Sequence, residues 1–164
     1  MDLFKVKTTL SLTIFVLLVI CSSQGLSNFL GTLSKDDILQ NFPSWREEAD
    51  SYSPSIQTIH ELNGLDYPVK IEIFLGTWCP DSKQHVSAYF KIMEMADNPL
   101  LTTTYIGIPR DKEDRKSYIQ GKNIIRVPTF IVYIHGHEQG RIIEHPKKSV
   151  EEDLMDIIQG SPDQ

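Results

Sequence analysis

A cysteine between two regular elements is the residue of this sequence best placed to do chemistry. Cys79 lies in the run Trp78-Cys79-Pro80-Asp81-Ser82, after a stretch with strand character and before one with helix character. The first turn of a helix carries unpaired backbone N–H groups and the positive end of the helix dipole, so it stabilises a thiolate. The chemistry expected of Cys79 is therefore attack on a disulfide, which forms a mixed disulfide.

The charged neighbours of Cys79 have opposing effects on the stability of its thiolate. Asp81 lies one turn away and disfavours the anion, while Lys83 and Arg126 favour it. A lone cysteine is more often a small buried apolar residue than a nucleophile. The position at a helix start nevertheless favours a reactive, partly exposed thiol over that alternative.

The histidines offer two further kinds of site, and the sequence supports neither. His135, His137 and Glu138 could ligate a metal, but the run His-Gly-His-Glu-Gln-Gly is typical of a polar hairpin, so we predict no metal site and no cofactor. A cysteine-histidine hydrolase needs a histidine oriented on Cys79. His85 lies six residues along the same expected helix and is expected to point elsewhere.

Alternating strand and helix patterns surround the cysteine. Val69 to Leu75 has apolar residues at every second position, as a half-buried strand does, and an apolar stripe at helical spacing follows Pro80. The order strand-helix-strand-helix-strand-strand-helix predicts an α/β fold with parallel pairs and a closing hairpin. The other expected elements are short helical pieces within 35–62, strands over 102–108, 130–134 and 141–144, a helix over 113–120, and a last helix beginning at Ser149 with a capping box.

The first 25 residues form a separate segment. Lys5 and Lys7 precede an apolar run that ends at Cys21, and small residues follow. The uncharged stretch 8–21 is shorter than the roughly 20 residues that span a bilayer, so the pattern predicts a signal peptide and export to the periplasm or the extracellular space. Lipid attachment at Cys21 is the alternative, although Ile20 is bulky where a lipobox has a small residue. Membrane association is expected only in that case.

Composition limits the classes of function. The 164 residues carry a formal charge of −6, which argues against a nucleic-acid partner because phosphate contacts need clustered Lys and Arg. Only two cysteines are present, so a disulfide scaffold is excluded. One globular domain of this size buries enough apolar surface to fold alone.

Two motifs and the order of the elements resemble the thioredoxin family. The motifs are Trp78-Cys79-Pro80-Asp81-Ser82 at the strand-to-helix turn and Val127-Pro128-Thr129 before the third expected strand. The resemblance covers about residues 55–160 and is closer to secreted and periplasmic bacterial members, which often have Gly-Thr-Trp-Cys in this turn. It implies a thioredoxin fold in which a cis-proline at position 128 faces the cysteine.

The resemblance also implies an architecture. We expect a central mixed four-stranded sheet flanked by helices, because the front segment lacks a clear first strand. The expected divisions are a signal peptide over 1–25, an N-terminal helical extension over 26–53 and a thioredoxin-like domain over 54–160.

The chain departs from the family pattern at two positions. The family's working unit is Cys-x-x-Cys, and Ser82 stands at the second position, where it cannot resolve a mixed disulfide. Its hydroxyl can at best hydrogen-bond the Cys79 sulfur and favour the thiolate. Ile73 stands where the family has a buried acid that takes the proton of the resolving thiol. The second thiol and the acid that would take its proton are thus both absent from these positions, which favours chemistry with a single thiol.

We therefore expect an exported thioredoxin-fold thiol-disulfide oxidoreductase of the monothiol, Cys-x-x-Ser type, whose partners are protein or low-molecular-weight thiols and disulfides. The alternative is a redox-silent thioredoxin-fold module that binds extended polypeptides, with its cysteine incidental. The resemblance assigns catalysis to Cys79 and Ser82, and substrate binding to Trp78, Pro80, Val127 and Pro128.

Overall fold

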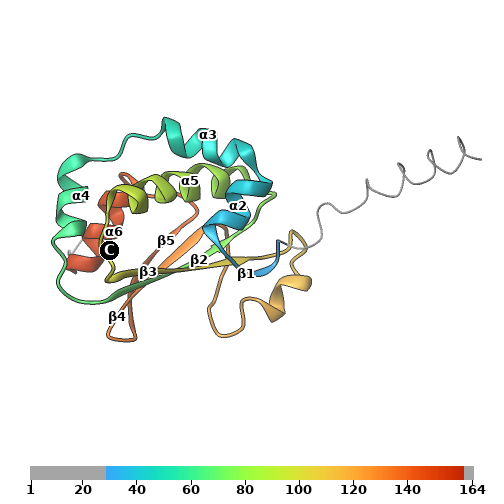
Figure 1. Cartoon of the computed structure of the whole chain (residues 1–164). Helices are drawn as coiled ribbons and strands as arrows, with labels where there is room; N and C mark the ends of the chain where they lie inside the picture. Colours follow the sequence, from blue (N-terminus) through green and yellow to red (C-terminus); the bar gives the residue numbers. More distant parts are fainter. Residues whose placement is uncertain (1–28, 161–164) are drawn as a thin grey trace, which may run out of the picture.

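A five-stranded mixed sheet forms the centre of the computed structural model, which describes residues 29–160 (Figure 1). The strands are β1 (Gly31–Leu33), β2 (Val69–Leu75), β3 (Leu101–Gly107), β4 (Thr129–Ile134) and β5 (His137–Ile143), in the spatial order β1-β3-β2-β4-β5. β2 and β3 are parallel, and the other neighbouring pairs are antiparallel. The mixed α/β class predicted from the sequence is confirmed.

The α-helices gather over one side of the sheet, as Figure 1 shows. Among residues 29–160, no helix is long and apolar enough to cross a bilayer. The segment predicted as a signal peptide, with Cys21, lies outside the described residues. The helices are α2 (Lys35–Asn41), α3 (Pro43–Ser51), α4 (Ile56–Asn63), α5 (Pro80–Met95) and α6 (Val150–Gln159), with a 3-10 helix η2 (Asp114–Ser117).

The alternation of side chains along β2 separates two apolar clusters. Ile71, Ile73 and Leu75 are almost fully buried in the larger cluster beneath the helices. Phe74 points to the opposite side, as expected for its neighbour in an extended strand. The smaller cluster on that side contains the cysteine expected to react, and its members are Phe74, Cys79, Ile108, Ile124, Val127 and Ile131.

Serine side chains cap the starts of α2 and α6. The Ser34 Oγ accepts the Asp37 N–H at 3.0 Å, and the Asp37 carboxylate accepts the Ser34 N–H at 3.0 Å, which completes a capping box at α2. The Ser149 Oγ accepts the Glu152 N–H at 3.3 Å, and α6 ends at Gly160 with φ of +67°. The helix start predicted at Ser149 is confirmed, and the first of the short helical pieces predicted within 35–62 begins after Ser34.

The sheet has one strand more than predicted. β1 pairs antiparallel with β3, with Thr32 opposite Ile106, so the expectation of four strands is wrong. Three residues are too few to show alternation, and β3 supplies the hydrogen-bonding partner that makes this segment a strand. The helix expected over 113–120 is also wrong, because only η2 forms there and none of its residues is buried.

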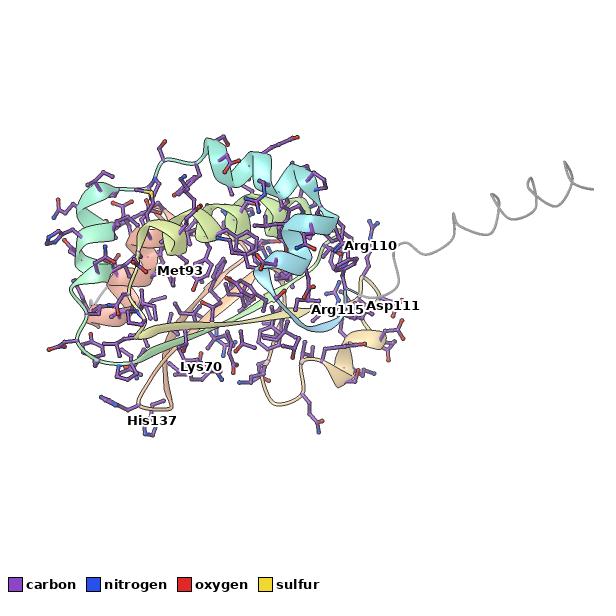
Figure 2. The ribbon with its side chains drawn as sticks, viewed as in Figure 1. Lys70, Met93, Arg110, Asp111, Arg115 and His137 are labelled. Atoms are coloured by element: carbon purple, nitrogen blue, oxygen red, sulfur yellow. The ribbon has the colours of Figure 1, made fainter. Side chains whose placement is uncertain are left out.

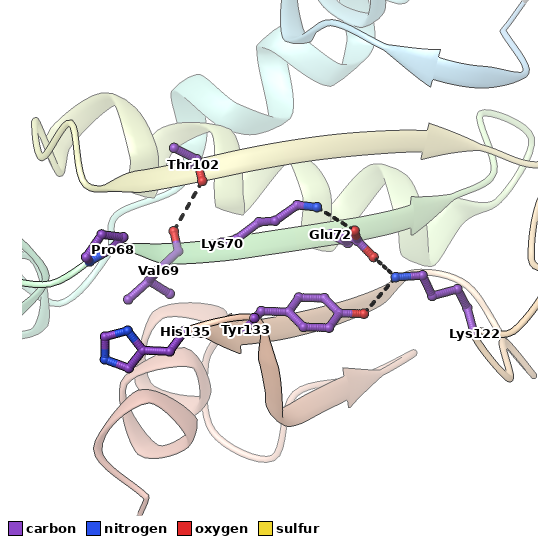
Figure 3. A pocket seen from close by; sticks show the side chains of 9 residues that line it. Pro68, Val69, Lys70, Glu72, Thr102, Lys122, Tyr133 and His135 are labelled. Carbon is purple, nitrogen blue, oxygen red and sulfur yellow. Dashed lines mark hydrogen bonds and ion pairs between the residues drawn. The ribbon is translucent and has the colours of Figure 1, made fainter.

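The buried carboxylate of Glu72 lies on the sheet face opposite the helices, where it lines a cavity of about 480 Å³ (Figure 3). Glu72 is 9% exposed and accepts hydrogen bonds from the ammonium groups of Lys70, at 2.8 Å, and Lys122, at 2.5 Å. Lys122 also donates to the Tyr133 hydroxyl at 2.9 Å. Burial opposes the charged form, but the two ammonium groups outweigh it and lower the pKa of Glu72.

Replacing Glu72 by glutamine should lower the free energy of unfolding at neutral pH by roughly 1–3 kcal/mol, because an amide leaves both ammonium groups poorly paired. The folded pKa of Glu72 lies below its unfolded value, so this contribution is present above the unfolded value and is lost as the pH falls through the folded one. Urea unfolding of wild type and Glu72→Gln should therefore converge at acid pH.

The matched control is Glu113→Gln, which removes the exposed ion pair with Lys116. It should cost less than about 1 kcal/mol at any pH. A difference between wild type and Glu72→Gln that stays constant from neutral to acid pH would contradict this account of Glu72.

Candidate functional site

Cys79 lies just beyond the carboxyl end of β2, where the chain turns into α5. It is the N-cap residue of that helix, with extended torsions (φ −99°, ψ 122°), and Pro80 is the first helical residue. The Cys79 N–H donates to the Gly76 carbonyl at 2.9 Å, and the Cys79 carbonyl accepts the Lys83 N–H at 3.0 Å. The structure therefore places the thiol at a helix start, as the sequence predicts.

A proline loop faces the thiol. The Val127–Pro128 peptide bond is cis, and Pro128 directly precedes β4. The Cys79 thiol donates to the Val127 carbonyl, with 3.5 Å between sulfur and oxygen. The cis-proline that the resemblance implies is present, and it lies beside the cysteine.

The thiol is less exposed than predicted. Cys79 is 8% exposed, so the expectation of a partly exposed side chain is wrong. The reason is tertiary, because Val127 covers the sulfur and the smaller apolar cluster lies beneath it. The hydrogen bond to Val127 also needs a protonated thiol, so forming a thiolate breaks that bond.

Ser82 supports the turn. Its side chain is fully buried in the first turn of α5, and its Oγ accepts the Gly76 N–H at 3.2 Å. The sequence allowed at best a hydrogen bond from this hydroxyl to the Cys79 sulfur, but the hydrogen bond of the Ser82 Oγ in the structure is the one that it accepts from the Gly76 N–H. Ser82 therefore holds the loop that carries Cys79, and Ile73, where the family has its acid, is fully buried in β2.

Trp78 is the exposed aromatic residue of the site, with 37% of its surface accessible. Its Nε1 donates to the Ile108 carbonyl at 3.0 Å. A Cβ at Gly76 would lie 2.5 Å from the indole, so only glycine allows the ring to lie there. The guanidinium carbons of Arg115 and Arg110 lie 5.1 and 5.9 Å from the ring centre. Figure 2 shows the two arginines at the same end of the molecule.

The two arginines are functional candidates that the sequence analysis missed. They follow β3 and lie 32 and 37 residues after Trp78, so no local motif connects them with the turn. Arg115 is held by its own hydrogen bonds to the carbonyls of Pro109, at 2.8 Å, and Arg110, at 2.7 Å. Only the fold brings their positive charge to the tryptophan beside the thiol.

The cations predicted to favour a Cys79 thiolate are engaged with carboxylates. The Lys83 ammonium lies 3.7 Å from Glu48, and Arg126 pairs with Glu144. Their charge is thus largely compensated.

Of the four residues assigned to substrate binding, only two are accessible. Trp78 and Pro80 are exposed, whereas Val127 and Pro128 are buried. The latter two can therefore contribute backbone groups or a wall, while side-chain contacts fall to Trp78 and Pro80.

The histidines are distributed over both ends of the sheet. His135 and Gly136 form the tight β4–β5 turn, both with positive φ, and His137 begins β5. Figure 2 shows His137 at the opposite end of the molecule from Arg110 and Arg115. His85, on α5, lies beside His145, with 3.3 Å between its Nε2 and the His145 Nδ1.

Comparisons with known proteins bear on the family and the fold of the chain. A family model described as thioredoxin matches residues 34–157. A Pseudomonas aeruginosa protein of unknown function has a similar crystal structure, with a TM-score of 0.52 at 15% identity over 84% of this chain and 86% of that one. Thioredoxin from Trypanosoma brucei brucei gives a TM-score of 0.41 at 18% identity over 64% of this chain and 87% of its own. No curated protein matches the chain.

The matched range covers α2 to α5 and β2 to β5 completely and α6 as far as Ile157, and the cysteine turn and the proline loop lie within it. The thioredoxin fold expected from the two motifs is thereby confirmed, with the added strand β1. This chain belongs to the thioredoxin family.

Proposed function

We propose that this protein is an exported thiol-disulfide oxidoreductase of the monothiol type that forms mixed disulfides through Cys79. The observation that carries the proposal is the position of the Cys79 thiol, at the start of α5 and 3.5 Å from the carbonyl of the cis-proline loop, with Ser82 in place of a second thiol. The apolar, lysine-flanked segment before residue 25 supports export.

The reaction is a disulfide exchange. The Cys79 thiolate attacks one sulfur of a substrate disulfide, the substrate S–S bond breaks, and the other substrate sulfur leaves as a thiolate that takes up a proton. The product is a mixed disulfide on Cys79. Ser82 carries no thiol, so an external thiol such as glutathione must resolve the mixed disulfide. Its thiolate attacks the substrate sulfur of the mixed disulfide, forms a new disulfide with that half of the substrate, and releases Cys79 as a thiolate.

The proline loop supports this sequence of steps. While Cys79 is a thiol, its hydrogen occupies the Val127 carbonyl. In the mixed disulfide the sulfur has no hydrogen, so this carbonyl becomes available to accept a backbone N–H of an extended substrate. The exposed rings of Trp78 and Pro80 lie in the same turn, and Arg110 and Arg115 beside Trp78 favour substrates with carboxylates near the disulfide.

A redox-silent binding module is the second candidate, and the burial of Cys79 favours it. A side chain that is 8% exposed and hydrogen-bonded to Val127 resembles a structural cysteine. In that case Trp78 and Pro80 would contact an extended polypeptide, and no bond to sulfur would form.

The rate of thiol exchange separates the two candidates. In a chain with Cys21 replaced by serine, Cys79 should react with a small aromatic disulfide at neutral pH faster than the same chain unfolded in urea. With oxidised glutathione, mass spectrometry should find one glutathione on Cys79. If Cys79 reacts more slowly in the folded chain than in the unfolded chain, the oxidoreductase proposal is overturned and the binding module is supported. The Cys79→Ser variant, which lacks this thiol, is the negative control.

A further inference from the structure

Polar side chains from separate parts of the chain converge on the cavity that Glu72 lines. Lys70 and Tyr133 are register partners on β2 and β4, and Lys122 comes from the segment between η2 and β4. The volume of about 480 Å³ lies within the range of about 300–1,000 Å³ that is typical of small-molecule sites. The lining, as described for residues 29–160, includes no residue of the cysteine turn or the proline loop, so the cavity is separate from the thiol site.

Hydrogen-bond donors are in excess at one end of this cavity. Each oxygen of Glu72 already accepts an ammonium group, Oε1 from Lys70 and Oε2 from Lys122. An ammonium group has three N–H donors, so both lysines have donors beyond those bonds and the one from Lys122 to the Tyr133 hydroxyl. The hydroxyl hydrogen of Tyr133 meets no acceptor among residues 29–160. A group that only accepts hydrogen bonds, such as a carboxylate, fits these donors.

The charge at this end of the cavity also fits an anion. Lys70 and Lys122 contribute two positive charges, and Glu72 contributes one negative charge. Arg141 adds no net charge, because its guanidinium forms two hydrogen bonds with the Glu138 carboxylate, at 2.7 and 2.8 Å. The excess of one positive charge matches a ligand with one carboxylate, and hydrogen bonds from ammonium groups to a carboxylate are among the stronger ones.

The rest of the cavity offers apolar contact. Figure 3 shows Lys70 and Tyr133 extending toward Lys122, with Pro68 and His135 at the opposite end. The ammonium groups of Lys70 and Lys122 lie 5.9 and 4.9 Å from the centre of the Tyr133 ring, so this aromatic ring lies beside the cations. A ligand that spans the cavity therefore needs an anionic group at one end and an apolar body that can contact an aromatic ring.

The donors are held in place before a ligand arrives. Glu72, a 9% exposed residue in the middle of β2, holds both ammonium groups through its carboxylate. The carbonyl of Lys122 accepts a hydrogen bond from the Arg141 guanidinium at 3.1 Å, which ties the segment before β4 to β5. Donors that are already ordered lose less conformational freedom on binding, which favours affinity.

We propose that this cavity binds a small organic anion with one carboxylate and an apolar, aromatic body. The carboxylate accepts hydrogen bonds from the ammonium groups of Lys70 and Lys122 and from the Tyr133 hydroxyl, while the body contacts the Tyr133 ring and Pro68. Inorganic phosphate fits less well, because it has no apolar part for the other end of the cavity. The proposal does not depend on the chemistry of Cys79.

Titration of the ¹⁵N-labelled full chain with benzoate, followed by its amide NMR signals, tests the site. The signals of Lys70, Lys122 and Tyr133 should shift and saturate, and neutral benzamide should bind about 10-fold more weakly or worse. Tyr133→Phe keeps the ring and loses one donor, so it should weaken benzoate binding by about 3- to 10-fold. Lys122→Met should weaken it by about 10-fold or more, and Cys79→Ser should bind as wild type does.

The matched control is Lys116→Met, which removes a lysine outside this cavity whose ammonium group pairs with Glu113. Its affinity for benzoate should equal that of wild type. The proposal is overturned if the cavity signals do not saturate, if benzamide binds as tightly as benzoate, or if Lys116→Met loses as much affinity as Lys122→Met. Tighter binding of inorganic phosphate than of benzoate would also overturn it. The thermal midpoint of each variant without ligand shows that a loss of affinity is not a loss of folding.

Discussion

Ser82→Cys should close a local disulfide with Cys79 under mild oxidation and acquire reductase turnover, whereas wild type stops at the mixed disulfide. The two positions are the N-cap and the third residue of α5. Side chains at this spacing meet in other helices of the same molecule: the Ser34 hydroxyl lies 2.6 Å from the Asp37 carboxylate, at α2. A second thiol at position 82 would therefore have the reach that a disulfide needs.

Ser87→Cys is the matched control for this gain. Ser87 is also a fully buried serine on α5, but it lies eight residues from Cys79, roughly 12 Å along the helix axis. Cys21 is replaced by serine in both variants, so each variant has two thiols. On mild oxidation, only Ser82→Cys should lose both free thiols while the protein stays monomeric. Reduction of a model protein disulfide, followed over many turnovers, gives the second readout.

Failure of Ser82→Cys to form its disulfide would show that the turn is not built as a redox site, and would favour the binding module. Folding is checked separately by thermal unfolding, because Ser82 loses its hydrogen bond from Gly76 in this variant. The thiol is similar in size to the hydroxyl, so that loss should cost only about 1 kcal/mol.

Glu151→Ala should destabilise the protein by roughly 2–4 kcal/mol, one of the largest effects expected from a single charged side chain here. Glu151 is 3% exposed, and its carboxylate accepts the Tyr52 hydroxyl at 2.7 Å and the Ser55 N–H at 3.0 Å. It thus joins α6 to the connection between α3 and α4. Replacement by alanine leaves the Tyr52 hydroxyl and the Ser55 N–H without this acceptor and creates a cavity at a buried position.

The adjacent residue supplies the control. Glu152 carries the same charge on the same helix turn, but its carboxylate accepts an exposed hydrogen bond from Ser149. Glu152→Ala should cost less than about 1 kcal/mol, and Glu151→Gln should recover part of the loss because its amide oxygen still accepts. Equal destabilisation by Glu151→Ala and Glu152→Ala in urea unfolding would contradict the role given to the buried carboxylate.

Elements with a strong internal pattern could be predicted from the sequence. β2 alternates apolar residues and α5 repeats them at helical spacing, so each indicates its own structure before any partner is known. β1 has three residues and no such pattern, and it becomes a strand only through its hydrogen bonds to β3. The segment around η2 has turn and helix residues but no apolar face, so tertiary contacts decide its form.

The candidate site divides in the same way. The sequence by itself determined that Cys79 follows a strand and begins a helix, that Ser82 replaces a second thiol, and that Pro128 precedes the third expected strand, because these are properties of neighbouring residues. The tertiary structure alone decided that Val127 covers the sulfur, that Arg115 lies against Trp78, and that His145 meets His85. Each of these contacts joins residues at least 30 positions apart, and only the packing of β4, β5 and the 108–127 segment around α5 sets such distances.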